Sequence, residues 1–354
     1  MSSSLPLLHE WMDSEFWNHG AFITSLDEGF VSLGKGGKTI IVDHFLSTQD
    51  PVFYLKNFFE NTYLAYQPKA FVRVPRSEFL DWLGTLGYEE NPLTPFSNDD
   101  ELYEKDFFHL KNSMTTSLQK VVLVSRETYK GFREEESIKK FLKKAFLFGT
   151  GTPYGMWNRH YGVIGSTPEV LFHLQDLTLK TFALAGTSKA GEEDKLLQSL
   201  KERHEHELVI KDICEKLSLF MKDLTVHETH LHPFKTLVHL KTEIEGVISR
   251  DCDLTSLTNT LSPTSALGGY PQDESMDFLK NTLYSKKYPM RYFGSAIGLM
   301  SPWTREFLVS IRNVQWKEGL VFIESGGGVV ADSEKHREME EIHLKRNTIK
   351  NHYL

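Results

Sequence analysis

Two segments of the chain carry pairs of glutamates at helical spacing. Glu202 and Glu205 are three residues apart in KERHEHELV. Glu338 and Glu341 are three apart in EMEEIHLK, and Lys345 lies four positions further on. Residues at i, i+3 and i+7 share one helix face, so each segment offers two carboxylates on one stripe. Two such stripes facing each other would form an all-oxygen site of the kind that Mg²⁺ prefers, although glutamate-rich helix faces are more commonly just solvated.

An arginine and a glycine run suggest a ligand that is an anion. Arg312 lies in LVSIRNV, which has the composition of a strand. A charge is rarely left unpaired there, so Arg312 is expected either to form a structural salt bridge or to bind a substrate carboxylate through two hydrogen bonds. The glycines at 326–328 are expected to form a turn, whose N–H groups could converge on an anion. Together with Lys345 and the glutamates, these features favour a dicarboxylate substrate.

Helices and strands must position these side chains. A long helix is predicted from about 192 to 222, another over 133–147, and a last one from near Ser333 toward 350. Strands are predicted at 38–45, 70–76 and 120–125, as a pair around the Ser-Thr-Pro turn of 161–174, and as a hairpin over 305–324 that turns at 317–319. Because the two kinds of element mix without regular βαβ alternation, the sequence predicts an α+β fold.

The composition limits the class of protein. The 354 residues include 40 Lys+Arg and 48 Asp+Glu, a net charge of −8, which disfavours general nucleic-acid binding. Two cysteines are too few for a disulfide framework and predict a reducing compartment. No apolar run approaches the roughly 20 residues that cross a bilayer, and the N-terminus lacks the pattern of a secretory signal. We therefore expect a cytoplasmic enzyme with neither nucleic acid nor membrane as a partner.

One apparent motif is set aside. SLGKGGKT, at 32–39, is similar to a phosphate-binding loop, but Ser32 stands where the first glycine is needed. A glycine-rich hairpin is the better interpretation of this run.

The order of several runs resembles the chorismate-utilising enzymes: isochorismate synthase, salicylate synthase, and the large subunits of anthranilate and aminodeoxychorismate synthases. The matching runs, in order, are GSTPEVLF, LAGT, KERHEHELV, LVHLKTEIEG, SPTSALGGYP, VSIRN, SGGGVVADS and EMEEIHLK, which together cover about 165–345. The resemblance implies a two-sheet α/β sandwich of the anthranilate synthase component I type, with helices outside and an active-site cleft. It also implies that 1–110 is a variable part of the same fold and 111–354 the catalytic region, within one structural domain.

The resemblance also implies how the substrate is held. Glu205 and Glu341 match the direct Mg²⁺ ligands, and Glu202 and Glu338 match water-mediated partners. The metal would bind the carboxylate on the chorismate ring. Arg312 matches the residue that holds the enolpyruvyl carboxylate, helped by backbone N–H groups around Gly326 and Gly328, and Lys345 matches a position near a substrate carboxylate. Thr187 and His239 match positions beside the ring. Ala266 and Leu267 match the pocket wall beside the nucleophile.

Two residues match the acid and the base. Chorismate loses its C4 hydroxyl while a nucleophile adds at C2, and hydroxide leaves poorly without a general acid. Glu169 matches that acid and would need a raised pKa, which an apolar cleft can supply; alternatively it only caps a nearby N–H. Lys120 matches the base that activates water, but KVVLVSR has one residue more than the usual spacing. Either a bulge follows Lys120, or Val121 takes the base position and Lys120 points to the other face.

Within the family, isochorismate synthase fits best. Ala185 stands where some aminodeoxychorismate synthases have a nucleophilic lysine, and the role of Glu324, which replaces a more usual aromatic or glutamine, stays open. Salicylate synthase, an ammonia-using synthase component and a catalytically silent chorismate-binding protein remain alternatives. The pathway served, menaquinone or siderophore synthesis, is left open. We expect Mg²⁺ as cofactor, no glutamine amidotransferase domain in the chain, and a monomer.

Overall fold

Two ten-stranded antiparallel sheets organise the part of the chain that the structure describes. This computed structural model describes residues 5–25, 29–115, 117–149, 151–234 and 237–354. The first sheet runs in the order β16 (Gly269–Tyr270), β8 (Lys120–Lys130), β20 (Leu320–Val330), β19 (Asn313–Lys317), β10 (Tyr161–Thr167), β9 (Thr152–Trp157), β1 (Gly20–Thr24), β2 (Phe30–Lys35) and β6 (Ala70–Pro75), with β7 (Thr94–Asn98) against β8. The second runs in the order β13 (Met221–Val226), β15 (Leu237–Ile248), β12 (Thr178–Lys189), β11 (Val170–Gln175), β18 (Arg305–Val309), β17 (Ala296–Met300), β4 (Val52–Lys56), β5 (Tyr63–Gln67) and β3 (Lys38–Val42), with β14 (His230–Phe234) against β15.

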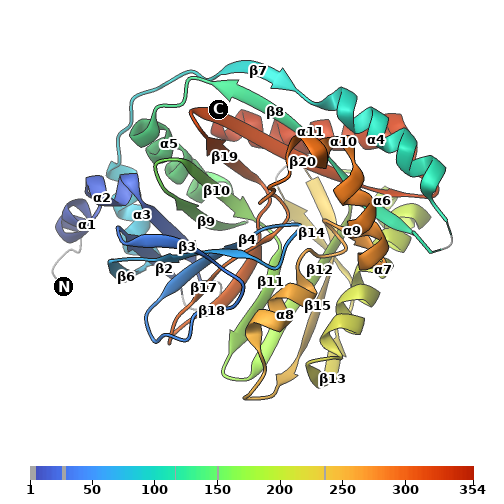
Figure 1. Cartoon of the computed structure of the whole chain (residues 1–354), viewed down its shortest axis with the longest axis horizontal. Helices are drawn as coiled ribbons and strands as arrows, with labels where there is room; N and C mark the ends of the chain where they lie inside the picture. Colours follow the sequence, from blue (N-terminus) through green and yellow to red (C-terminus); the bar gives the residue numbers. More distant parts are fainter. Residues whose placement is uncertain (1–4, 26–28, 116, 150, 235–236) are drawn as a thin grey trace.

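Helices cover the outer faces of both sheets. Their bounds are α1 (Leu5–Trp11), α2 (Ser14–Asn18), α3 (Arg76–Thr85), α4 (Asp100–Ser113), α5 (Glu134–Leu147), α6 (Glu193–Gln198), α7 (Leu200–Leu217), α8 (Leu254–Leu261), α9 (Gln272–Asn281), α10 (Leu283–Lys287) and α11 (Lys335–Tyr353). Figure 1 shows α4, α5 and α11 on the side of β8, β10 and β20, and α7 beside β12 and β15. The α+β sandwich expected from the sequence is therefore confirmed.

One apolar core lies between the two sheets. It joins Ala21 of β1 and Met156 of β9 with Phe53 of β4 and Leu308 of β18. Side chains from both sheets thus exclude water together, as in other face-to-face sheet packings. A second apolar cluster packs Leu257 of α8, Leu279 of α9 and Tyr284 of α10 with Ala183 of β12 and Phe307 of β18.

The chain crosses repeatedly from one sheet to the other. Strands β10 and β11 belong to different sheets, and so do β18 and β19. The predicted hairpin over 305–324 is therefore only half right: β19 and β20 pair through a turn at Lys317–Gly319, but β18 lies in the opposite sheet. Likewise β2 and β3 are in different sheets, so the glycines at 36–37 form a crossover and no hairpin.

Two other predictions need correction. The run at 325–328 forms no turn, because it lies inside β20 and pairs with Val122–Ser125 of β8. The long helix predicted over 192–222 is two helices, since the chain breaks at Ser199, whose side chain accepts a hydrogen bond from the N–H of Glu202 and caps α7.

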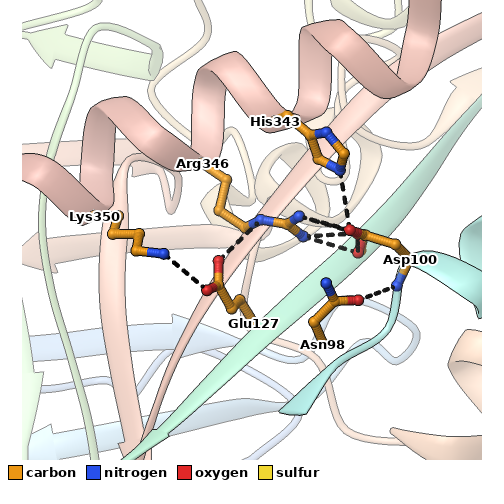
Figure 2. Close-up of polar contacts among 7 residues, drawn as sticks. Asn98, Asp100, Glu127, His343, Arg346 and Lys350 are labelled. Atoms are coloured by element: carbon orange, nitrogen blue, oxygen red, sulfur yellow. Dashed lines mark hydrogen bonds and ion pairs between the residues drawn. The ribbon is translucent and has the colours of Figure 1, made fainter. Parts of the chain in front are cut away.

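A buried ionic cluster fixes α11 against β8. The guanidinium of Arg346 lies 3.0 Å from the carboxylate of Asp100 and 3.4 Å from that of Glu127, and it donates to Ser125 Oγ. Figure 2 shows His343 and Lys350 of the same helix reaching the same two carboxylates. Because Ser125 and Glu127 belong to β8, this cluster sets where α11 lies along that strand.

Candidate active site

A cavity of about 70 Å³ opens between the two sheets. The residues that the sequence predicted for the site and that line it are Glu169, Thr187, Glu205, His239, Ala266, Leu267, Arg312, Gly326, Gly328, Glu341 and Lys345. Of the other predicted residues, Lys120 contacts Glu205, Glu202 contacts Thr187, and Glu338 packs behind Gly327. The structure thus brings all fourteen predicted residues to one place, from elements far apart in the sequence.

The two glutamate pairs lie on the first two turns of α7 and α11, as the spacing predicted. Glu205 and Glu341 face the cavity, and Glu338 is fully buried. Burial and the charge of Glu205 raise the pKa of Glu202 to about 7. Burial and the charge of Glu341 also raise the pKa of Glu338. Carboxylates crowded in this way fit a divalent cation with oxygen ligands, since such an ion would relieve their repulsion.

Three lysines neutralise these carboxylates. Lys120 Nζ lies 2.8 Å from Glu205 Oε1, and Lys345 Nζ lies 2.5 Å from Glu341 Oε1. Burial opposes ionisation of Glu205, but the ammonium groups of Lys120 and Lys201 lower its pKa below the ordinary value. Glu205 is therefore held in its ionised form, which is the form that would bind a cation.

Lys120 points into the site. Strands β8 and β20 pair without a register shift over Lys120–Lys130, so no bulge follows Lys120. Its side chain is completely buried and reaches Glu205, while Val121 lies in the apolar core. Gly328 makes this approach possible, because a Cβ there would lie 2.8 Å from Lys120 Cε and would clash with Glu205.

Glu169 sits where the chain crosses from β10 to β11. Burial raises the pKa of this carboxyl to about 7, opposed by a hydrogen bond from Thr264 and by the charges of Lys120 and Arg312. The Thr264 hydroxyl donates to Glu169 Oε1 at 3.1 Å. A buried carboxyl with such a pKa can hold and release a proton near neutral pH, which is the property of a general acid.

Arg312 lies in the second crossover and not inside a strand. It falls between β18 and β19 with a φ of +54°, a left-handed conformation that is uncommon for a residue with a long side chain. Burial lowers its pKa to about 10, against the opposing charges of Glu341 and Glu169. Strain of this kind is found at ligand-binding positions, where the fold compensates for it.

The remaining polar wall is a short hydrogen-bonded chain. Glu202 Oε2 accepts from the N–H of Thr187 at 2.9 Å, and the Thr187 hydroxyl lies 3.0 Å from His239 Nδ1. Lys345 donates to the carbonyl oxygen of Gly326 at 3.0 Å. Through these contacts the helix residues are tied to the strands that line the cavity.

Sequence reasoning missed two residues of the site. Lys201 bridges Glu202 and Glu338, and Thr264 supports Glu169. Both lie within runs that carried the resemblance, KERHEHELV and SPTSALGGYP, but neither has a spacing signal of its own. Glu324, whose role was left open, does not line the cavity and lies in a buried network with Arg126 at 2.8 Å and Gln315 at 2.7 Å.

Comparison with known proteins agrees with this geometry. The family model described as "Chorismate binding enzyme" matches residues 99–352, which is most of the chain. The chain belongs to this family. The resemblance stated from the sequence is therefore confirmed. Every residue that lines the cavity of this chorismate-binding enzyme lies within the matched region.

Relatives of this chorismate-binding enzyme include several synthases. It is 29% identical over 194 residues to the isochorismate synthase MenF of Pasteurella multocida, covering 51% of this chain and 44% of that protein. It is also 29% identical over 197 residues to anthranilate synthase component 1 of Acetivibrio thermocellus, covering 52% and 39%. The chain spans about half the length of the curated relatives it matches, or less.

Solved structures show the same fold over nearly the whole chain. MenF, the menaquinone-specific isochorismate synthase from Escherichia coli, superposes with a TM-score of 0.82 at 18% identity, covering 97% of this chain and 90% of that one. Anthranilate synthase component I from Streptococcus pneumoniae gives 0.72 at 14% identity, covering 92% and 93%. At these identities the likeness concerns the fold alone. Among the described residues, no helix has both the length and the apolar content needed to cross a membrane.

Proposed function

We propose that this chorismate-binding enzyme converts chorismate to isochorismate with Mg²⁺ as cofactor. The observation that carries the proposal is Glu169, a buried carboxyl with a pKa near 7, in one cavity with Arg312 and the inner glutamates. Similarity to proteins named isochorismate synthase supports the choice of product. Ala185, in place of a nucleophilic lysine, argues against one type of aminodeoxychorismate synthase.

The proposed chemistry moves a hydroxyl group with no net change in composition. Lys120 acts as the base that takes a proton from water as the oxygen adds to C2. The ring double bond shifts, the C4–oxygen bond breaks, and Glu169 gives its proton to the departing hydroxyl, which leaves as water. One water enters and one leaves, so no oxidant or co-substrate is needed.

The substrate would be held by its two carboxylates. Mg²⁺ bound by Glu205 and Glu341, with Glu202 and Glu338 outside them, would supply positive charge for the ring carboxylate. Arg312 would hold the enolpyruvyl carboxylate, with the N–H groups near Gly326 and Gly328, and Lys345 would add positive charge. Thr187 and His239 would contact the ring, and Ala266 and Leu267 would flank the attacking water.

Product analysis tests this proposal. The purified chain is incubated with chorismate and Mg²⁺, with and without ammonium, and the products are identified by chromatography and mass. Isochorismate in both conditions is the expected result. Salicylate with pyruvate, an amine formed only with ammonium, or chorismate bound without turnover would each overturn it in favour of a different family activity.

The base is tested separately with Lys120→Ala. We expect a loss of turnover of at least a hundredfold, in line with general-base catalysis. Lys130→Ala at the exposed far end of β8 is the matched control and should retain turnover. Unchanged turnover in the Lys120 variant would remove Lys120 from the mechanism.

A further inference from the structure

Lys201 occupies a distinctive place at the metal site proposed above. It is the second residue of α7, and its Nζ lies 3.1 Å from Glu202 Oε1 and 2.9 Å from Glu338 Oε1. Glu338 belongs to α11, so this one ammonium group links the two helices that carry the glutamate pairs. The Glu338 carboxylate is 1% exposed, whereas Lys201 is 26% exposed.

The contacts of Lys201 differ in kind from those of the other two lysines. Lys120 and Lys345 pair with Glu205 and Glu341, the carboxylates expected to bind the metal directly. A cation at those carboxylates would compete with both lysines. Lys201 pairs only with the outer glutamates in its described ion pairs, so its contacts can persist when a metal is bound.

The outer glutamates are in turn connected to the rest of the site. Glu202 Oε2 accepts from the N–H of Thr187 on β12, and a Cβ at Gly327 of β20 would lie 3.3 Å from Glu338 Oε2. Lys201 therefore stands at the centre of a chain of contacts that runs from one sheet through α7 and α11 to the other.

We propose that Lys201 is a positioning residue for the divalent cation: it holds α7 and α11 at the separation that lets Glu205 and Glu341 bind one ion. This inference rests on the proposed metal-dependent function. Residues outside the direct ligands commonly orient them, and their loss typically costs 10- to 100-fold in metal affinity.

The charge of Lys201 taken alone predicts the opposite change in Mg²⁺ affinity when this residue is removed. Lys201 is a cation beside a cation site, so its removal makes the site more negative by one charge. If Lys201 acted only through its charge, its loss would strengthen Mg²⁺ binding. If it positions the helices, its loss weakens binding despite the more favourable charge.

The experiment measures Mg²⁺ binding to the purified full chain by isothermal titration calorimetry, without chorismate. Lys201→Met is expected to weaken Mg²⁺ affinity by about tenfold or more, and Lys201→Arg, which keeps the bridge, should restore most of it. Lys216→Met is the matched control: it also removes an ion pair of α7, that with Asp212 at 2.7 Å, but one within the same helix. It should leave Mg²⁺ affinity unchanged.

The outcomes distinguish failure of the proposed Mg²⁺-dependent function from failure of the positioning role of Lys201. If the parent chain takes up no Mg²⁺, the proposed metal-dependent function fails. If the parent chain binds Mg²⁺ and Lys201→Met binds it equally well or more tightly, the function stands and the positioning role is overturned. Equal losses in Lys201→Met and Lys216→Met would also overturn it, because the effect would then belong to the stability of α7.

Discussion

The buried carboxyl of Glu169 lowers the stability of the folded chain at high pH and serves as the proposed general acid. Its carboxyl is 3% exposed, and burial raises its pKa to about 7. An unfolded chain would have the ordinary value of about 4.3. The folded state therefore binds more protons between these values, so this group makes the folded chain less stable as the pH rises through that range.

We predict that Glu169→Gln abolishes turnover and yet stabilises the protein at alkaline pH. At pH 8 the variant avoids a buried charge that costs up to about 4 kcal/mol, whereas at pH 5 the carboxyl is already neutral and the two proteins should be similar. Urea unfolding at both pH values measures this. A difference in the free energy of unfolding that is the same at pH 5 and pH 8 would contradict the raised pKa.

The same pKa fixes the direction of the pH dependence in the parent enzyme. A general acid works only while protonated, so turnover should fall as the pH rises above about 7. Because the Thr264 hydroxyl stabilises the ionised form, Thr264→Val should move this fall to higher pH.

At the scale of elements, α11 combines a chemical and a structural face. Glu341 and Lys345 line the cavity, while Arg346, the next residue, anchors the helix to Asp100 and Glu127. The anchor is 4% exposed, so its charge is satisfied by these two carboxylates and not by water (Figure 2). The position of the catalytic face thus depends on contacts made by the opposite one.

We predict that Arg346→Met lowers the free energy of unfolding by about 3 kcal/mol, because it removes the buried guanidinium from two largely buried carboxylates. The change leaves them, among the described residues, only His343 and Lys350 as charged partners. Lys350→Met is the control on the same helix. Lys350 pairs with Glu127 at 3.0 Å but is 36% exposed, so its loss should cost less than about 1 kcal/mol. Denaturant unfolding of both variants gives the comparison, and similar losses would show that the buried cluster contributes no more than a surface pair.

The elements also show what a sequence can and cannot reveal. The helix over 133–147 is confirmed as α5, because periodicity and the acidic first turn are local signals. The crossovers that carry Glu169 and Arg312 were predicted as a turn and a strand. Alternation of apolar residues identifies a strand but not the sheet it joins, and partners of a buried strand lie far away in the sequence. The convergence of the site residues was predicted from the ordered motifs and not from spacing.

At the scale of the whole molecule, the first hundred residues contribute strands to both sheets. Strands β1, β2 and β6 extend the first sheet beyond β9, and β3, β4 and β5 extend the second beyond β17. We propose on this basis that 1–110 and 111–354 form one structural domain, although the family model begins only at residue 99.

We predict that a chain beginning at residue 99 is insoluble or aggregated. Its sheets would end at β9 and β17, two buried strands whose edges would be left unpaired. Soluble yield and size-exclusion chromatography measure the effect, and co-expression with the fragment 1–98 should recover soluble protein. A monomeric, folded product from the shorter chain alone would refute the one-domain proposal.

The pairing of β8 with β20 has a consequence for synthesis on the ribosome. Lys120 lies opposite Val330, so this end of β8 waits for 210 further residues before its partner residue on β20 exists. Contacts this distant in sequence form late and slow folding. The nascent chain must therefore leave this edge of β8 unpaired through most of translation. A ribosome that stalls before α11 leaves a polypeptide that has made every described strand but lacks Glu341 and Lys345 of the site.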